Sequence, residues 1–337
     1  MDITHDGHER RLGILLAFGA LVWSGTYNAL AKGLTPYLSP MSLLILSEVL
    51  TAVFIVMTFG LVPLLRQMVR LDAKSFRMCV IYGIFNSVLA PLLWFTGLKL
   101  TSAVNASVLS ASDIVCVLVL SQIFLGERMT KVQFAGLMTI LLGIFVVNTG
   151  YHNGTVDVHL GDGLIILASF FSACGTVIFK KNLSHMMPEL AILIRNIAAI
   201  LTVSVLSVIL EVSVAQEVAA FPLQKILLLL AFTFFSRYLN LTFFYEALDR
   251  LPAMTFSLIQ VANPLSGIAF AFLLLGEEVQ LYQMAGCGLI LIGLTIENLS
   301  PKTIPTTLRI QTLLETFRLR KHAHRADTSM PLIPKNV

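Results

Sequence analysis

The chain has 337 residues, of which 56% are hydrophobic and only 12% are Asp, Glu, Lys or Arg. Soluble domains carry about 25% charged residues, so this composition argues against a water-soluble enzyme, a nucleic-acid-binding protein and a disordered chain. It predicts an all-α polytopic membrane protein that lies in the lipid bilayer.

Ten apolar runs follow one another along the chain, and each is close to the length of about 20 residues that a helix needs to cross a bilayer. We expect ten transmembrane helices at residues 12–31, 41–63, 77–98, 102–125, 132–149, 162–180, 188–210, 224–248, 253–275 and 281–297.

Most of the 23 Lys and Arg residues fall on one side of this arrangement, and only Lys32, Lys99 and Lys225 fall in the opposite loops. Because basic loops stay in the cytoplasm, we expect both termini to be cytoplasmic. The expected location is a bacterial inner membrane, and the sequence leaves both a monomer and a homodimer open.

The two halves of the chain resemble each other. A shift of 148 residues relates the start of each half and a shift of 150 relates the rest, and the matched pairs are Ser24 with Ser172, Lys32 with Lys180, Ser107 with Ser257, Gly136 with Gly286, and Gly143 with Gly293. Five helices per half place the second copy upside down in the membrane, as in many secondary transporters. We expect inverted repeats at 1–150 and 151–300.

The basic tail at 301–337 has two interpretations. An apolar stripe through Leu313 and Phe317, flanked by arginines, predicts an amphipathic helix on the inner membrane surface; the alternative is a solvated, disordered tail. In the longest outer loop, Asn153 begins a match to the glycosylation acceptor motif.

Several short motifs occur in a fixed order along the chain: Trp23-Ser24, Lys32, Lys180, Arg195, Tyr245-Glu246-Ala247-Leu248, Ala253, Asn263-Pro264 and Gly276-Glu277. Over residues 12–297 this set resembles the EamA-type family of the drug/metabolite transporter superfamily. The resemblance implies two inverted five-helix repeats and transport of small metabolites.

The first half departs from the family pattern at two places. Arg195 corresponds to Ser47, which is followed by Glu48, and the Asn263-Pro264 pair corresponds to Asp113 and Ile114. The first half therefore has acidic residues near the positions where the second half has Arg and Pro.

Polar and charged residues inside the spans are the candidate substrate-binding residues, because a charge at the membrane centre costs about 2.5–3.5 kcal/mol on insertion scales. The predicted site consists of Glu48, Asp113, Arg195, Arg237, Asn240, Tyr245, Gln260 and Asn263.

Specific roles follow for some of them. Arg237 beside aromatic residues suits a carboxylate-bearing ligand, and the alternative is an ion pair with Asp113 or Glu48 that only holds the helices together. Burial penalises the ionised form of a carboxylate, so Asp113 and Glu48 are the candidates for proton coupling. Pro264 is expected to kink the ninth helix.

Aromatic and amide side chains lie toward the outer halves of the first and third spans. Trp23, Tyr27 and Asn28 either line an outward mouth or anchor the first helix at the membrane surface. Trp94 is interpreted as a membrane anchor.

Sequence signatures of other function classes are absent. There is no GxxxxGK[ST] loop for ATP, no HExxH or GxSxG motif, and no Cys/His metal spacing, so we expect no enzyme activity, cofactor or metal. The leading hypothesis is a secondary transporter of small polar metabolites, with amino acids or related compounds as the first candidates. A receptor or scaffold without transport is the alternative, and an intramembrane enzyme is a weaker one.

Overall fold

The computed structural model describes residues 3–62, 68, 71–126, 129–148, 151–152, 155–156, 160–183, 186, 188–251 and 253–299. Its contacts divide the chain into Met1–Ser300 and Pro301–Val337, and every described residue belongs to the first of these units. The predicted amphipathic tail and the acceptor at Asn153 lie outside the described residues.

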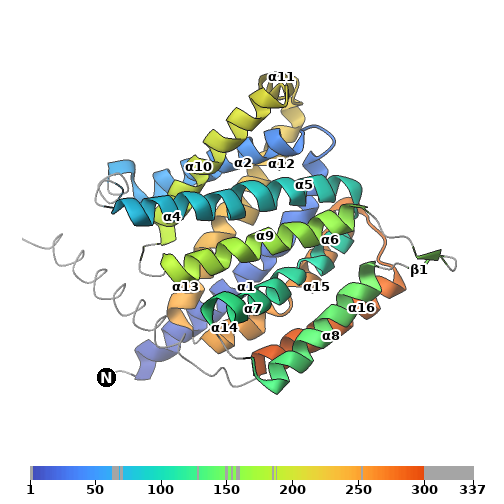
Figure 1. Cartoon of the computed structure of the whole chain (residues 1–337). Helices are drawn as coiled ribbons and strands as arrows, with labels where there is room; N and C mark the ends of the chain where they lie inside the picture. Colours follow the sequence, from blue (N-terminus) through green and yellow to red (C-terminus); the bar gives the residue numbers. More distant parts are fainter. Residues whose placement is uncertain are drawn as a thin grey trace, which may run out of the picture. The chain divides into compact units, whose positions relative to one another are not determined.

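The first half forms five helical rods, numbered here as helices 1 to 5 (Figure 1). Helix 3 contains a π-helical segment, η1, and helix 4 is built from two shorter helices. In chain order the elements are α1 (Ile3–Leu34), α2 (Pro40–Phe59), α4 (Ala73–Gly83) with η1 (Ile84–Leu89) and α5 (Ala90–Leu100), α6 (Ala103–Leu109) with α7 (Ser112–Leu125), and α8 (Lys131–Asn148).

The second half repeats this order as helices 6 to 10, after a short hairpin. Its elements are β1 (Tyr151–His152) paired antiparallel with β2 (Thr155–Val156), α9 (Leu160–Asn182), α10 (Pro188–Ile209), a connecting α11 (Val214–Ala219), then η2 (Leu223–Lys225), α12 (Ile226–Ala231), the π-helical η3 (Phe232–Leu239) and α13 (Asn240–Arg250) in helix 8, α14 (Ala253–Gln260) with α15 (Asn263–Leu275) in helix 9, and α16 (Leu281–Leu299).

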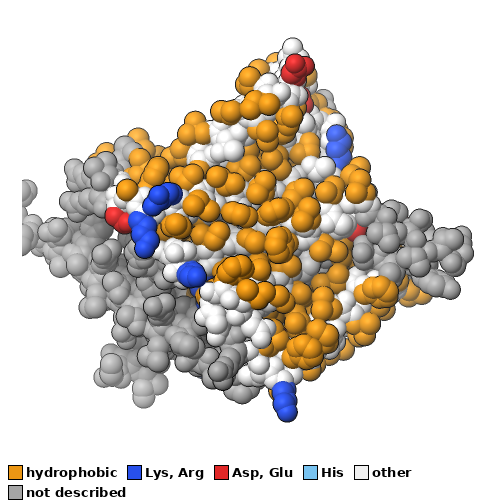
Figure 2. Space-filling view, viewed as in Figure 1, with side chains coloured by type: hydrophobic (Ala, Val, Ile, Leu, Met, Phe, Trp, Pro, Cys, Tyr) orange, Lys and Arg blue, Asp and Glu red, His pale blue; other side chains and the backbone are white. Residues whose placement is uncertain are grey.

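The helices have the length and composition of membrane spans. Within the described ranges, eight are long and apolar enough to cross a bilayer, and α8 is a shorter apolar helix. Figure 2 shows hydrophobic side chains over most of the viewed face, with Lys and Arg toward its margins. The chain is therefore an integral multi-pass membrane protein, and the predicted all-α fold of ten helices in two repeats is confirmed.

Contacts between α8 and α16 show that the repeats are inverted. A Cβ atom added at Gly136 would lie 2.8 Å from the carbonyl oxygen of Gly293, and one at Gly143 would lie 2.7 Å from that of Gly286. The repeat pairs Gly136 with Gly286 and Gly143 with Gly293, so each contact maps onto the other. This exchange requires antiparallel helices related by a two-fold axis.

The first helix of each repeat packs into the other half of the molecule. Helix 1 packs against helices 8 and 9, and helix 2 packs against helix 8; likewise helix 6 packs against helices 3 and 4, and helix 7 packs against helix 3. We call helices 1, 2, 8 and 9 bundle A, and helices 3, 4, 6 and 7 bundle B. The bundles meet where helix 2 contacts helix 7 and helix 4 contacts helix 9.

Helices 4 and 9 are interrupted at equivalent points. Helix 9 breaks at Val261 and Ala262, directly before α15, which has Pro264 in its first turn. Helix 4 breaks at Ser110 and Ala111, although no proline follows there. The interruption is therefore a property of the repeat, and the sequence reasoning that relied on Pro264 missed the one in helix 4.

Candidate functional site

A cavity of about 190 Å³ lies between the two bundles. Its walls come from helices 1, 3, 4, 8 and 9, and most of the lining residues are small or polar: Ser24, Gly25, Tyr27, Asn28, Trp94, Ser107, Ser110, Asn240, Asn263 and Gly267. Hydroxyl and amide groups lining a cavity of this size suit a small polar molecule.

The break in helix 9 is tied to helix 1 by a hydrogen bond. The Ser24 hydroxyl donates to Oδ1 of Asn263 at 2.6 Å. The repeat relates these residues to Ser172 and Asp113, and Ser172 is the hydrogen-bonding neighbour of the Asp113 carboxyl group. A carboxylate thus replaces the amide in the other half, and Oδ1 of Asp113 is buried without a partner among the described residues.

Asn28 connects three helices at the cavity wall. Its amide donates to the Ser107 hydroxyl at 3.0 Å and accepts from the Trp94 indole at 3.0 Å. The interpretation of Trp94 as a membrane anchor is therefore wrong, because its ring lines the cavity. Trp23 is half-buried and does not line the cavity; its ring stacks on Phe235 of helix 8 with 4.6 Å between the ring centroids.

Two π-helical segments lie at matching places in the repeats, η1 in helix 3 and η3 in helix 8. A π-turn adds a residue to a helical turn and is often found at functional sites. Asn86 lies in η1 and Arg237 lies in η3, and both side chains reach the second helix of a repeat. The local backbone therefore helps to place the charged groups.

Arg237 forms a buried ion pair with Glu48. Its guanidinium donates to Oε1 of Glu48 and to the Ser47 hydroxyl. The Glu48 side chain is 0% exposed and that of Arg237 is 11% exposed. The second oxygen of Glu48, Oε2, has no hydrogen-bond partner in the described part of the chain.

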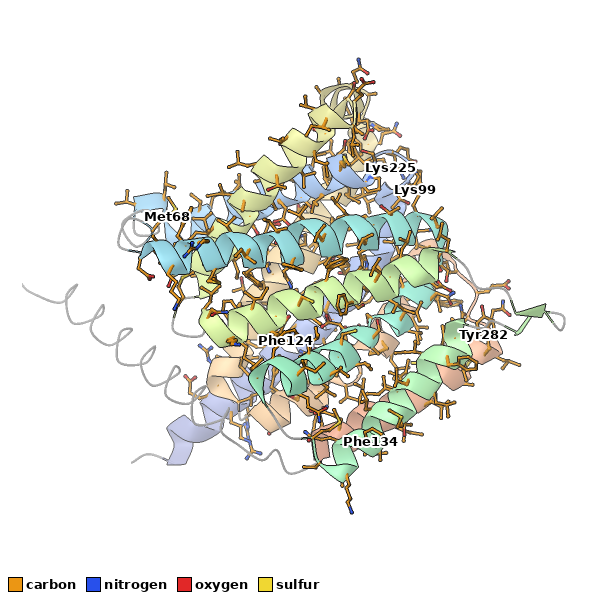
Figure 3. The ribbon with its side chains drawn as sticks, viewed as in Figure 1. Met68, Lys99, Phe124, Phe134, Lys225 and Tyr282 are labelled. Atoms are coloured by element: carbon orange, nitrogen blue, oxygen red, sulfur yellow. The ribbon has the colours of Figure 1, made fainter. Side chains whose placement is uncertain are left out.

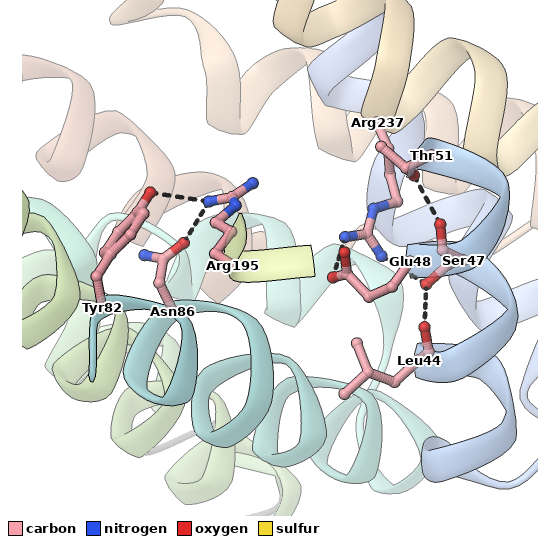
Figure 4. A network of polar contacts seen from close by, with 8 residues as sticks. All are labelled: Leu44, Ser47, Glu48, Thr51, Tyr82, Asn86, Arg195 and Arg237. Carbon is pink, nitrogen blue, oxygen red and sulfur yellow. Dashed lines mark hydrogen bonds and ion pairs between the residues drawn. The ribbon is translucent and has the colours of Figure 1, made fainter. Parts of the chain in front are cut away.

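Arg195 is held at the opposite crossing. Its Nη1 donates to the Tyr82 hydroxyl at 2.9 Å and to Oδ1 of Asn86 at 2.8 Å, whereas its buried Nε lacks a partner among the described residues. Figure 4 shows Arg195 held by Tyr82 and Asn86, and Arg237 held by Ser47 and Glu48.

Glu48, Arg195 and Arg237 all influence Tyr27 electrostatically, and Glu48 also lies within electrostatic reach of Arg195. We call these three charged residues the arginine cluster. Tyr27 also lines the cavity. Tyr27 therefore links the cluster electrostatically to the cavity. With one carboxylate for two guanidinium groups, the cluster has a surplus of positive charge.

The other residues of the predicted site lie around the cavity and the arginine cluster. Asn240 and Asn263 line the cavity, and Asp113 follows the lining residue Ser110 by one turn. Tyr245 lies within electrostatic reach of Arg195. Gln260 donates to the carbonyl oxygen of Ala17 at 3.3 Å, so it ties helix 9 to helix 1.

Sequence reasoning missed several polar residues that position the candidate groups: Ser24, Ser47, Tyr82, Asn86 and Ser172. All are polar residues in apolar runs, which is the signal that selected the charged residues. The repeat offered a second signal, because it relates Ser24 to Ser172 as it relates Asn263 to Asp113.

Comparison with known proteins agrees with this architecture. The chain matches the EamA-like transporter family over residues 11–149 and 159–299, which covers both repeats. A solved crystal structure shares the fold with a TM-score of 0.56 at 18% sequence identity, covering 84% of this chain and 95% of the other.

Two relatives match part of the chain. One, from Methanothermobacter thermautotrophicus, is named "Uncharacterized transporter" and is 26% identical over 218 residues, which cover 64% of this chain and 62% of the relative. Another, from Salmonella typhimurium, is named "Probable amino-acid metabolite efflux pump" and is 29% identical over 176 residues, which cover 51% of this chain and 59% of the relative. The match thus spans about three fifths of each relative's length. With the family match across both repeats, these findings show that the chain belongs to the EamA-like transporter family, within the drug/metabolite transporter superfamily.

Proposed function

We propose that this protein exports amino acids or related carboxylate-bearing metabolites by alternating access, as a secondary transporter. The observation that carries the proposal is the arginine cluster, two guanidinium groups with one carboxylate beside a polar cavity. A buried surplus of positive charge favours an anionic group on the ligand.

The ligand's carboxylate has a donor available at Arg195. A guanidinium binds a carboxylate through two parallel N–H groups, and Nε of Arg195 has no partner among the described residues. We place the substrate carboxylate between Arg195 and Arg237, where it competes with Glu48 for Arg237.

The amino group of a zwitterion requires acceptors in the same region. Oε2 of Glu48 and Oδ1 of Asp113 are buried carboxylate oxygens that lack hydrogen-bond partners in the described part of the chain. An ammonium group satisfies such oxygens and neutralises their charge. Asn240 and Asn263 then add neutral donors and acceptors along the cavity wall.

Asp113 is also our candidate for proton coupling. Glu48 is engaged in an ion pair with Arg237, whereas the neighbour of Asp113 is the neutral hydroxyl of Ser172. Protonation of Asp113 during the cycle would link transport to a proton gradient. We do not assign this role to Glu48.

Export and membrane orientation complete the proposal. The efflux direction is supported by the name of the Salmonella relative. The excess of Lys and Arg on the side of both termini supports an inner-membrane protein with cytoplasmic ends. Figure 3 shows Lys99, Lys225 and Tyr282 at one end of the helices and Met68 and Phe124 toward the other. We take the end with Lys99 as the outer end. The moving bodies of the proposed cycle are bundles A and B, each of which combines helices from residues 1–150 with helices from residues 151–300.

Counterflow in proteoliposomes tests the proposal. Liposomes that contain the purified protein and are loaded with an unlabelled amino acid are expected to accumulate the labelled form from outside. The Arg195→Gln and Arg237→Gln variants are expected to abolish this accumulation. Arg250→Gln is the matched control, because Arg250 is an arginine of helix 8 whose carboxylate partners are Glu9 and Glu246, away from the cavity lining. Binding of amino acids without flux would favour a receptor, and absence of both binding and flux across an amino-acid library would overturn the substrate class.

A further inference from the structure

Two of the ordered motifs, Lys32 and Gly276-Glu277, belong neither to the cavity nor to the arginine cluster. Both lie at a second hollow of about 500 Å³ at the outer end of the helices. Its lining is mainly charged and polar, and includes Lys32, Lys99, Thr101, Ser102, Glu277 and Glu278.

Lys32 holds the end of helix 3. Its ammonium group, in the last turn of α1, donates to the carbonyl oxygens of Leu98 at 2.5 Å and Thr101 at 2.6 Å. Carbonyls at the end of a helix lack intrahelical partners and carry negative partial charge. A lysine from another helix therefore caps α5.

Glu277 holds the start of helix 4. Gly276 ends α15 with a φ of 66°, in the left-handed region that glycine adopts without strain. The chain then turns, and the two carboxylate oxygens of Glu277 accept from the backbone N–H groups of Ala103 and Val104, each at 3.0 Å. A carboxylate at this position also complements the positive end of the helix dipole.

These contacts join the two bundles. Lys32 is in helix 1 and Glu277 follows helix 9, both in bundle A, whereas the turn formed by Thr101 and Ser102 joins helices 3 and 4 of bundle B. One bundle thus holds both ends of a turn in the other through two opposite charges. We call this arrangement the outer clamp (Lys32 and Glu277 on the turn at 101–102).

A buried polar network joins the turn to helix 6 of bundle B and to helix 10. The Asp162 carboxylate, in helix 6, accepts from the Thr101 hydroxyl and from the Asn105 amide. Gln283, in helix 10, donates to Oδ1 of Asn105 at 2.6 Å. The turn is therefore held by side chains of helix 6, in bundle B, and of helix 10, which belongs to neither bundle.

The clamp lies directly outside the central cavity. Asn28 precedes Lys32 by one helical turn, and Ser107 follows Ala103 by one turn. Both Asn28 and Ser107 line the cavity, and the hydrogen bond between them joins helices 1 and 4 at its wall. Withdrawal of helix 1 from the turn would break the lysine contacts and this hydrogen bond together.

We propose that Lys32 and Glu277 are the outer gate residues of the transport cycle, and that they close the cavity by clamping the turn between helices 3 and 4. This inference rests on the proposed transport function for its role in the cycle. The accessibility of the cavity can be measured without any substrate.

Cysteine accessibility tests the gate. Cys79, Cys116, Cys174 and Cys287 are replaced by Ala, and Ser110→Cys reports from the cavity wall. A membrane-impermeant maleimide is added on the side from which Glu278→Cys is labelled. We expect Glu277→Gln and Lys32→Ala to label about tenfold faster at the reporter, which corresponds to about 1.4 kcal/mol.

The chain supplies matched controls in the same hollow. Glu278→Gln removes the neighbouring carboxylate and Lys99→Ala removes the other lysine, and both side chains are exposed. We expect these variants to label at the parental rate. If either clamp substitution prevents folding, Glu277→Asp keeps the charge but shortens its reach, and an intermediate labelling rate is expected.

The outcomes separate the gate from the substrate assignment. The gate proposal would be overturned if folded clamp variants labelled at the parental rate, or if labelling at the reporter were accelerated equally in the control variants. Faster labelling in the clamp variants alone, in a protein that shows no amino-acid counterflow, would support the gate and overturn the proposed substrate.

Discussion

The crossing of helix 2 with helix 8 and the crossing of helix 7 with helix 3 are related by the inverted repeat, yet they carry different chemistry. At the first, Arg237 from η3 meets Ser47 and Glu48; at the second, Arg195 meets Tyr82 and Asn86, the latter from η1. The arginine comes from opposite members of the helix pair. Duplication thus supplies a symmetric backbone, and side-chain substitution makes the site asymmetric.

The breaks in helices 4 and 9 show the same divergence. Ser24 bonds to the neutral amide of Asn263, whereas the equivalent Ser172 lies beside the carboxyl group of Asp113. A transporter needs a symmetric frame to exchange two states, but it binds an asymmetric ligand. The differences between the halves are therefore where ligand recognition and coupling are expected.

Removing the carboxylate from the first crossing is expected to have the largest effect. Glu48→Gln leaves Arg237 buried without its counter-charge, which costs about 3–5 kcal/mol of stability. The measurement is thermal or denaturant unfolding in detergent. Glu9→Gln is the control, because Glu9 also pairs with an arginine but its side chain is 46% exposed, so the expected loss is below about 1 kcal/mol. Equal losses would contradict the buried-pair account.

The symmetric frame can be broken at the contact between helices 5 and 10. A Cβ atom at Gly293 would lie 2.7 Å from the carbonyl oxygen of Gly136, whereas one at Gly288 meets nothing within 4 Å. Gly293→Ala is expected to destabilise the protein by about 1–3 kcal/mol through overpacking, and Gly288→Ala is expected to change unfolding little. Indistinguishable unfolding of the two variants would refute the close contact.

The second crossing can be made to resemble the first. Asn86→Asp gives Arg195 an acidic partner and neutralises the surplus charge of the arginine cluster. We expect substrate affinity to fall by about tenfold, or about 1.4 kcal/mol, while the unfolding temperature is kept. The affinity is read from substrate-induced thermal stabilisation, with Asn182→Asp as a control at the far end of helix 6. Unchanged affinity would show that the surplus charge does not bind the substrate.

Restoring symmetry at the helix breaks is expected to have a small effect on stability. Asp113→Asn makes this residue match Asn263, and we expect unfolding to shift by less than about 1 kcal/mol because the Ser172 contact can persist. The pH dependence of counterflow is expected to disappear. A variant with the parental pH profile would exclude Asp113 as the proton-coupling residue.

Much of the frame was predictable from the sequence, because apolar run length and the shift between the halves specify the helices and their inversion. Charged residues in apolar runs also pointed to Glu48, Arg195 and Arg237. Their partners were harder to predict, because η1 and η3 change which way Asn86 and Arg237 face, and hydropathy does not report π-turns. The break in helix 4 has no proline, so only its relation to helix 9 could have indicated it.

The central claim is that the arginine cluster binds the carboxylate of the substrate, and one comparison of ligands tests it most directly. Equilibrium binding to the purified protein is measured for an amino acid that is transported and for its carboxamide, which lacks only the carboxylate charge. We expect the amino acid to bind at least about tenfold more tightly than the carboxamide, because the charged hydrogen bonds to arginine are lost in the amide. Equal binding of the two ligands would contradict the central claim.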